Sequence, residues 1–115
     1  MASSFVPGPD TFRDYRDVLG CFGSGVTIVT VATPDGPMAM TANSFSSVSL
    51  DPPLVLWSVA KSSRRYQPFF EAPHFAIHVL DDTQQDVALH FAAHGNGFDR
   101  FCWAHNDDGV PVLQD

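Results

Sequence analysis

An uninterrupted run of β-branched residues, followed closely by a turn signal, constrains the fold of this chain more than any other feature. The run covers residues 26–31, Val-Thr-Ile-Val-Thr-Val, and such side chains favour a buried strand over a helix. Residues 34–37, Pro-Asp-Gly-Pro, come next, where proline fixes one φ angle and glycine accepts a positive one. We therefore expect the chain to return from Met38 as an antiparallel partner of the first strand.

Two more strands are predicted further along the chain, four in all, and a last segment begins what could be another. The backbone is extended at residues 51–53, Asp-Pro-Pro, and then runs through two short apolar segments, residues 54–59 and 75–80. After the turn signal at residues 107–109, residues 110–113 are typical of a strand, for which the sequence shows no partner. The pattern predicts a mostly antiparallel sheet, closed or half-closed.

Short helices are expected to flank these strands. The apolar spacing predicts one helix over residues 10–22, and a capping box at residues 82–85 opens another that ends near residues 95–97. Between them Ser62 or Ser63 can cap a short helical turn, and Pro68 is expected to prevent one continuous helix from Ser63 to Glu71 unless it breaks or restarts there.

Size and charge limit the class of protein. Because 115 residues fit one domain with one core, we expect residues 1–115 to form a single domain, mainly β within the α+β class. A net charge of −7 argues against nucleic-acid and anionic-membrane surfaces, since both select basic patches. We see neither a leader pattern nor an apolar run of the ~20 residues that span a bilayer. Cys21 and Cys102 make no disulfide framework and are expected to be buried as small apolar side chains. A cytoplasmic protein is therefore expected.

Residues 41–53 contain many small polar side chains and end at two consecutive prolines. Six of the nine residues from Thr41 to Ser49 carry a hydroxyl or an amide, so as one strand the stretch would present no cleanly apolar face. Such side chains, with backbone groups close by, suit a flat ligand with polar edges. The alternative is a solvent-facing strand and loop rich in serine and threonine.

A basic cluster follows at residues 61–65, Lys-Ser-Ser-Arg-Arg. Cations in the first turn of a helix oppose its dipole and repel one another, and a bound anion would offset both effects. Two hydroxyls, helix N-terminal N–H groups and flanking cations are the components of a phosphate site. The alternative is a solvated basic turn on an acidic protein.

Other motifs give little support to a metal centre or a hydrolase. His90 and His94 lie four apart on one predicted helix face, a spacing that suits a metal ion, yet the helix dipole alone explains histidine there. The glycine-rich residues 20–25 follow a helix and precede a strand, the reverse of a dinucleotide-binding loop. No Gly-x-Ser-x-Gly elbow is present, and the carboxylates are scattered.

Five short segments stand in an order and spacing that resemble one known family. They are residues 25–30, 35–36, 40–45, 47–54 and 75–80. The chain resembles, from about Phe12 to Leu113, the flavin reductase family, the short NAD(P)H:flavin oxidoreductases of two-component monooxygenase systems. The resemblance implies an FMN-binding split β-barrel, usually a homodimer with the flavin near the subunit interface. It also implies FMN or FAD as cofactor, NADH or NADPH as cosubstrate, and a separate oxygenase as partner.

The resemblance further implies which residues hold the flavin. Contacts to the isoalloxazine and ribityl portions would come from Thr41, Ala42, Asn43, Ser44, Ser47, Val48 and Ser49. Contacts to the phosphate would come from Ser62 and Ser63 with Lys61 or a neighbouring arginine, and further flavin-side positions are Phe91, Ala92 and Arg100. Such a reductase passes hydride from the reduced nicotinamide to flavin N5, so the protein positions two rings and no catalytic side chain is expected.

The chain departs from the family pattern near its C-terminus. Family members continue past the segment at residues 110–113 with further barrel strands, including a Gly-Asp-His segment, and this sequence has neither. We therefore expect the C-terminal barrel strands to be missing, which leaves a sheet edge that another chain could pair with. The alternative to a reductase is a non-catalytic flavin-binding module or an inactive fragment.

Overall fold

The hairpin predicted from residues 26–38 forms the centre of the structure. The computed structural model describes residues 6–11, 13, 26–42, 46–50, 52–80 and 82–114. Strand β1 (Thr27–Thr33) pairs antiparallel with β2 (Gly36–Ala42), and Thr33 is paired with Gly36 across the turn. Gly36 has a φ of 120°, and the Thr33 hydroxyl donates a hydrogen bond of 2.7 Å to the Gly36 carbonyl oxygen. The predicted turn and antiparallel return are confirmed.

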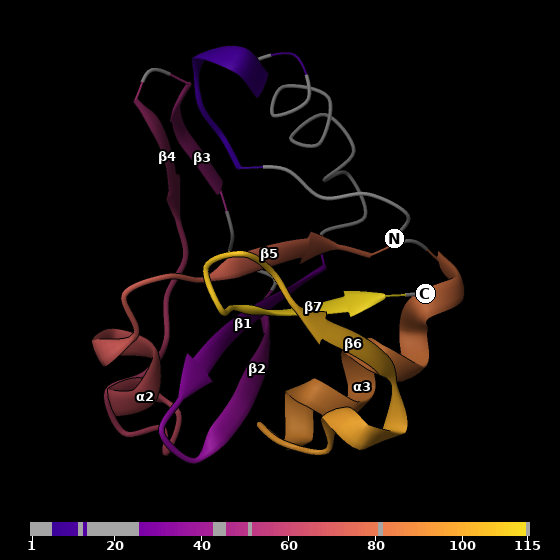
Figure 1. The fold of residues 1–115 in the computed structure, drawn as a ribbon. Coiled ribbons are helices and arrows are strands. Elements are labelled where there is room, and N and C mark those ends of the chain that lie inside the picture. Colours follow the sequence, from indigo (N-terminus) through magenta and orange to yellow (C-terminus); the bar gives the residue numbers. More distant parts are fainter. Residues whose placement is uncertain are drawn as a thin grey trace.

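The described residues form three small antiparallel sheets with short helices around them (Figure 1). The other elements are η1 (Pro9–Thr11), β3 (Ser46–Leu50), β4 (Pro53–Leu56), α2 (Tyr66–Glu71), β5 (Ala76–Val79), η3 (Asp82–Gln84), α3 (Gln85–Ala93), η4 (Phe98–Arg100), β6 (Cys102–His105) and β7 (Pro111–Gln114). The strand orders are β2-β1-β5, β3-β4 and β6-β7. Within the described residues the sheets are open and no barrel closes, so the fold is mainly β and antiparallel, with open sheets.

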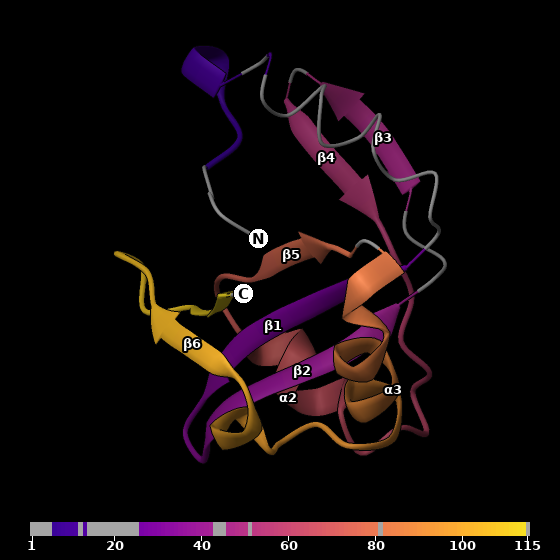
Figure 2. The same ribbon diagram turned by 90° about the vertical axis from the view of Figure 1, so that its right-hand side faces the viewer.

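The central sheet separates two apolar clusters, one beneath each α-helix. Figure 2 shows α3 in front of β1 and β2 and α2 behind them, and Figure 1 shows the same two sides. Neighbouring residues of β1 alternate between the clusters, with Ile28 on the α3 side and Val29 and Val31 on the α2 side. Phe91 of α3 and Phe69 of α2 are buried in the respective clusters. Because the side chains of β1 alternate between the two faces of the sheet, each face carries an apolar cluster against which one helix packs.

The C-terminal hairpin β6–β7 is bonded to the central sheet by two buried side chains. The Thr30 hydroxyl donates to the Pro111 carbonyl oxygen at 2.5 Å, and the Leu113 backbone N–H donates to Nε2 of His78 at 3.1 Å. Nδ1 of His78 lies 3.1 Å from the Ile28 carbonyl oxygen. Because Nε2 accepts a hydrogen bond, the proton of the neutral ring lies on Nδ1, which donates to Ile28. Burial lowers the pKa of His78, and the hydrogen bond to Ile28 opposes this shift.

The expectation that residues 110–113 lack a partner is wrong. Strand β7 pairs antiparallel with β6, and Asn106 shapes the turn between them. Its side-chain oxygen accepts hydrogen bonds from the backbone N–H groups of Asp108 and Val110, both at 2.9 Å, and Gly109 has a φ of 79°. Strand β6 is short and mostly exposed, so its sequence carries no apolar alternation by which to predict it.

The two described α-helices begin later than the sequence predicts. The N-cap of α2 is Arg65, and Pro68 falls in the first turn, where its missing N–H removes no intrahelical bond. Helix α3 follows the 3₁₀ turn η3 and has Gln84 at its N-cap, which makes no side-chain capping hydrogen bond. The Asp82 side chain, on which the predicted capping box depends, lies outside what the structure describes. The helix predicted over residues 10–22 lies mostly outside the described residues. Among the described helices none is long and apolar enough to cross a bilayer.

Candidate functional site

Residues 41–53 are divided between two sheets and do not form the single strand considered from the sequence. Strand β2 ends at Ala42 in the central sheet, whereas β3 belongs to the separate β3–β4 hairpin. Asn43 and Ser44, two of the expected flavin contacts, lie outside the described residues. The expected contacts on either side of them therefore come from different sheets.

The hydroxyl of Thr41 already has a partner within the protein. It donates a hydrogen bond of 2.6 Å to the Ala88 carbonyl oxygen and so ties β2 to α3. The Thr27 hydroxyl likewise donates to the carbonyl oxygen of Ala42 at 2.9 Å. A ligand at this strand end would find the Thr41 oxygen as an acceptor, because its proton is in use.

The β3–β4 hairpin projects from the central sheet and carries a β-bulge (Figures 1 and 2). Ser47 is paired with Val55 and Ser49 with Leu54, so Val48 is an extra residue in β3. The Val48 side chain is 59% exposed and Leu54 is 48% exposed. Because of the bulge, the three expected contacts on β3, Ser47, Val48 and Ser49, do not follow the regular alternation between the two faces of a strand.

The serine pair lies in a tight turn before α2. The Ser63 N–H donates to the Ala60 carbonyl oxygen at 2.9 Å, and the Ser63 hydroxyl oxygen accepts from the Arg65 N–H at 3.1 Å. Ser63 therefore closes this turn and does not cap the helix. Its hydroxyl proton remains available to an acceptor, and the neighbouring Lys61 and Ser62 are exposed. These groups form a cationic donor set that suits a phosphate.

Arg65 brings the turn at residues 60–65, called the serine loop below, together with two distant segments. Its Nη1 donates to the Ala39 carbonyl oxygen at 3.0 Å and to the Phe91 carbonyl oxygen at 2.6 Å, and its Nη2 donates to the Ala92 carbonyl oxygen at 3.1 Å. Burial lowers the pKa of the Arg65 guanidinium. The sequence singled out the basic cluster, but a local pattern gives no signal for partners 26 and 27 residues away.

Phe91 and Ala92 occupy the last turn of α3 in different ways. The Phe91 side chain is fully buried, so this residue can offer a ligand only its backbone. The Ala92 side chain is exposed. The carbonyl oxygens of both residues accept hydrogen bonds from Arg65, and the end of α3 therefore lies beside the serine loop.

Arg100 is exposed and pairs with a histidine on α3. Its Nη1 lies 3.1 Å from Nδ1 of His90, which must accept, and Nε2 of His90 then donates to the Asn96 carbonyl oxygen at 2.7 Å. His90 and His94 are in ring contact at 5.3 Å, but both nitrogens of His90 are engaged. The described residues contain no group of three side chains that could hold a metal ion.

Gly97 leaves no room for a side chain beside His90. Its φ is 89°, and an added Cβ would lie 2.5 Å from Nε2 of His90. Gly97→Ala is expected to lower the free energy of unfolding by about 2–4 kcal/mol, from the left-handed backbone and the displaced imidazole together. Gly109→Ala is the matched control, because its φ is 79° and nothing lies within 4 Å of the added Cβ. Urea unfolding of both variants measures the difference, and equal losses would contradict the role given to His90.

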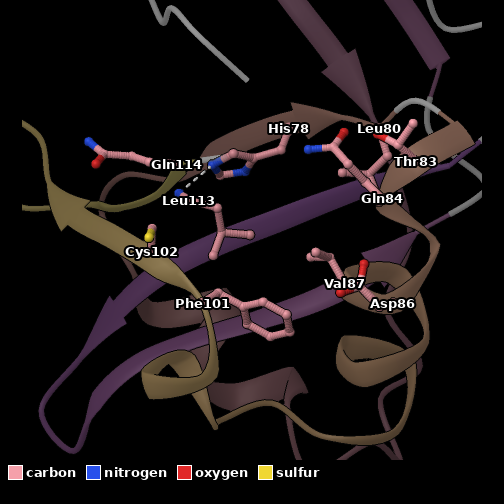
Figure 3. Close-up of a pocket in the computed structure, with 10 residues that line it drawn as sticks. All are labelled: His78, Leu80, Thr83, Gln84, Asp86, Val87, Phe101, Cys102, Leu113 and Gln114. Carbon is pink, nitrogen blue, oxygen red and sulfur yellow. Dashed lines mark hydrogen bonds between the residues drawn. The ribbon is translucent and has the colours of Figure 1, made fainter.

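A cleft of about 500 Å³ lies elsewhere, between the start of α3 and the C-terminal hairpin (Figure 3). Its apolar lining includes Val87, Phe101 and Leu113, and it shares no residue with the expected flavin contacts. Both ring nitrogens of His78 are hydrogen-bonded to the backbone, so this histidine belongs to the framework of the cleft. Cys102 is exposed at the cleft, and the expectation that it is buried is wrong.

Comparison with known proteins matches residues 19–115 to the model of the flavin reductase like domain. The chain is 57% identical over 109 residues to FMN reductase (NADH) SmoA of Agrobacterium fabrum, covering 95% of this chain and 63% of that protein. It is 46% identical over 103 residues to the reductase component of the flavin-dependent trigonelline monooxygenase of Acinetobacter baylyi, covering 88% and 33% respectively.

A solved structure agrees in fold as well as in sequence. The NADH:FAD oxidoreductase of Streptomyces globisporus, solved with NAD and FAD fragments, superposes with a TM-score of 0.71 at 41% identity and covers 96% of this chain and 67% of that one. The antiparallel sheets and short helices are those of the split-barrel fold of these reductases. The match covers nearly the whole chain but less than two thirds of the two relatives described above. The chain belongs to the flavin reductase like domain family.

Proposed function

We propose that this chain is a flavin reductase that transfers hydride from NADH or NADPH to FMN or FAD and supplies reduced flavin to a separate monooxygenase. One structural observation supports the proposal in addition to family membership. Hydrogen bonds from Arg65 hold the serine loop, with its cationic donor set, beside the end of α3 and the middle of β2. Three segments far apart in sequence thereby lie together: the serine loop, the end of α3 with Phe91 and Ala92, and β2, which ends at the expected contacts Thr41 and Ala42.

The proposed flavin contacts keep the assignment made from the sequence. They are Thr41, Ala42, Asn43, Ser44, Ser47, Val48, Ser49, Lys61, Ser62, Ser63, Phe91, Ala92 and Arg100. Lys61, Ser62 and Ser63 would hold the phosphate, because an ammonium and two hydroxyls match its charge and its acceptor oxygens. Phe91 would act through its backbone alone, since its side chain is buried. Thr41 would accept rather than donate a hydrogen bond, since its proton is given to Ala88.

The chemistry in this proposal belongs to the two bound rings. A flavin and a reduced nicotinamide supply the hydride acceptor and donor when they are bound, so the protein needs no nucleophile or acid–base residue. The chain would contribute binding and orientation, which are large effects when two reacting rings must meet face to face. His78, the most buried histidine of the described residues, serves the framework, consistent with this division.

We further propose a homodimer that acts in the cytoplasm as a single domain over residues 1–115. Val48 and Leu54 are exposed apolar side chains on a projecting hairpin, where a second subunit would cover them. The cytoplasm holds the nicotinamide pool on which the reaction depends. The chain covers 63% of the Agrobacterium fabrum reductase and 33% of the Acinetobacter baylyi reductase component. We therefore keep a non-catalytic flavin-binding module, or an inactive fragment, as the second candidate.

Flavin titration followed by an anaerobic NADH assay tests the proposal. We expect FMN to bind and to be reduced by NADH, and Ser62→Ala with Ser63→Ala to weaken FMN binding by about 10- to 100-fold, as two lost hydrogen bonds to a charged group imply. Ser58→Ala, at an exposed serine outside the site, is the control. Binding without NADH oxidation would favour a non-catalytic flavin-binding module. Absence of FMN binding would contradict both the reductase and the flavin-binding module and would leave the inactive fragment.

A further inference from the structure

The guanidinium of Arg65 is the point where three parts of the chain are joined. The guanidinium donates hydrogen bonds to three carbonyl oxygens, one in β2 and two in the last turn of α3, and the backbone N–H of Arg65 donates to the Ser63 hydroxyl oxygen within the serine loop. Two hydrogens of Nη1 and one of Nη2 are thus used on the backbone. In the sequence Arg65 lies 26 residues from Ala39 and 27 residues from Ala92.

The surroundings of Arg65 fit a permanent structural role. The last carbonyl groups of a helix carry partial negative charge, and a cation there satisfies them and interacts favourably with the dipole. The stem is enclosed as well, because a Cβ added at Gly95 would lie 3.1 Å from Cδ of Arg65 and 3.2 Å from Cγ of Met38. The Gly95 carbonyl oxygen also accepts from the Ala39 N–H at 2.9 Å. Glycine at position 95 therefore lets the arginine reach the strand and the helix together.

We propose that Arg65 is a positioning residue, which fixes the serine loop against β2 and α3 so that Ser62 and Ser63 can bind the phosphate end of the flavin. This inference rests on the proposed function. It differs from a direct arginine–phosphate contact, since most of the Nη hydrogens of Arg65 are engaged by the backbone. A lysine keeps the charge but lacks the planar fork that serves three acceptors at once.

Comparing FMN with riboflavin separates this role from a general loss of structure. In Arg65→Met we expect FMN binding to weaken by about tenfold or more, while riboflavin, which has no phosphate, binds within about twofold of its original affinity. Arg65→Lys is expected to restore little of the FMN affinity. Recovery of most of the affinity by lysine would overturn the proposal in favour of a direct ionic contact, and an equal loss for both flavins would overturn it in favour of a general structural role.

Amide hydrogen exchange of the protein without flavin gives a second readout. Faster exchange at residues 91–95 and in the serine loop is expected in Arg65→Met and in Arg65→Lys, since the bonds that hold these segments are lost. Arg64→Met removes the same charge from the neighbouring exposed side chain and is expected to leave exchange at residues 91–95 unchanged. Equal exchange in the Arg64 and Arg65 variants would overturn the proposal.

A double-mutant cycle between Arg65→Met and Ser62→Ala completes the test. If Arg65 acts through the serine loop, the second substitution weakens FMN binding much less than it does alone, whereas strictly additive losses would overturn the proposal. Failure of the proposed function has a different signature, because the unchanged chain would then bind neither FMN nor riboflavin. A chain that binds both flavins, with an Arg65→Met variant that binds both as the unchanged chain does, rejects this inference alone.

Discussion

Replacing Phe91 with alanine is expected to lower the free energy of unfolding by about 3–5 kcal/mol, the range for truncating a fully buried aromatic side chain. Phe91 joins α3 to the apolar cluster on one face of the central sheet. Its ring lies 5.0 Å from that of Phe98 and 5.5 Å from that of Phe101, centroid to centroid. The substitution would therefore leave a cavity among aromatic rings that cannot collapse without moving η4 and the start of β6.

Leu89→Ala on the same helix is the matched control for this substitution. Leu89 is 67% exposed, so its truncation is expected to change the free energy of unfolding by no more than about 0.5 kcal/mol. Urea unfolding followed by tryptophan fluorescence measures both variants, with Trp57 and Trp103 as reporters. A loss at Phe91 no larger than that at Leu89 would show that the cluster beneath α3 is not the core described here.

The strands that the sequence predicts correctly are those with local signals. The β-branched run and the following turn specify β1 and β2, because branched side chains and a glycine with positive φ act on their own neighbourhood. The strands at 54–59 and 75–80 are also found, although each is shorter than predicted. Strand β6 is missed because it is held by pairing with β7 across the Asn106 turn, and β7 is in turn bonded to Thr30 in a distant strand.

In the candidate site, too, the sequence predicts the features with local signals and misses those that depend on distant contacts. The serine pair and its basic neighbours are visible in the sequence, because hydroxyls and cations in one turn are a local pattern. The roles of Arg65 and Thr41 are not visible, since each depends on carbonyl oxygens in α3 that only the folded chain brings near. Phe91 shows the limit of assigning a role by its position in the family pattern. That position implies a contact with the flavin, but it does not reveal that the ring of Phe91 is buried.

The attachment of the C-terminal hairpin is expected to weaken as the pH falls below about 6.5. His78 is neutral in the folded chain, where Nε2 accepts from Leu113 and Nδ1 donates to Ile28. Burial lowers its pKa below the unfolded value of 6.5, so the unfolded chain binds more protons in acid. Its contribution to stability is therefore complete above pH 6.5 and decreases as the pH falls through that value toward the folded pKa.

Comparison with His78→Gln isolates this contribution from those of the other titrating groups. Glutamine can still accept from the Leu113 N–H but does not titrate, and loss of the bond to Ile28 is expected to cost about 1–3 kcal/mol at pH 8. The difference in unfolding free energy between the two chains should then stay nearly constant from pH 8 to about pH 7 and shrink as the pH falls through 6.5 toward pH 5. Asp86 and Cys102, which line the same cleft, are present in both chains and cancel in this comparison. A difference that stays constant over the whole range would mean that His78 titrates alike in the folded and unfolded chain, and that the ring does not hold the hairpin in its neutral form.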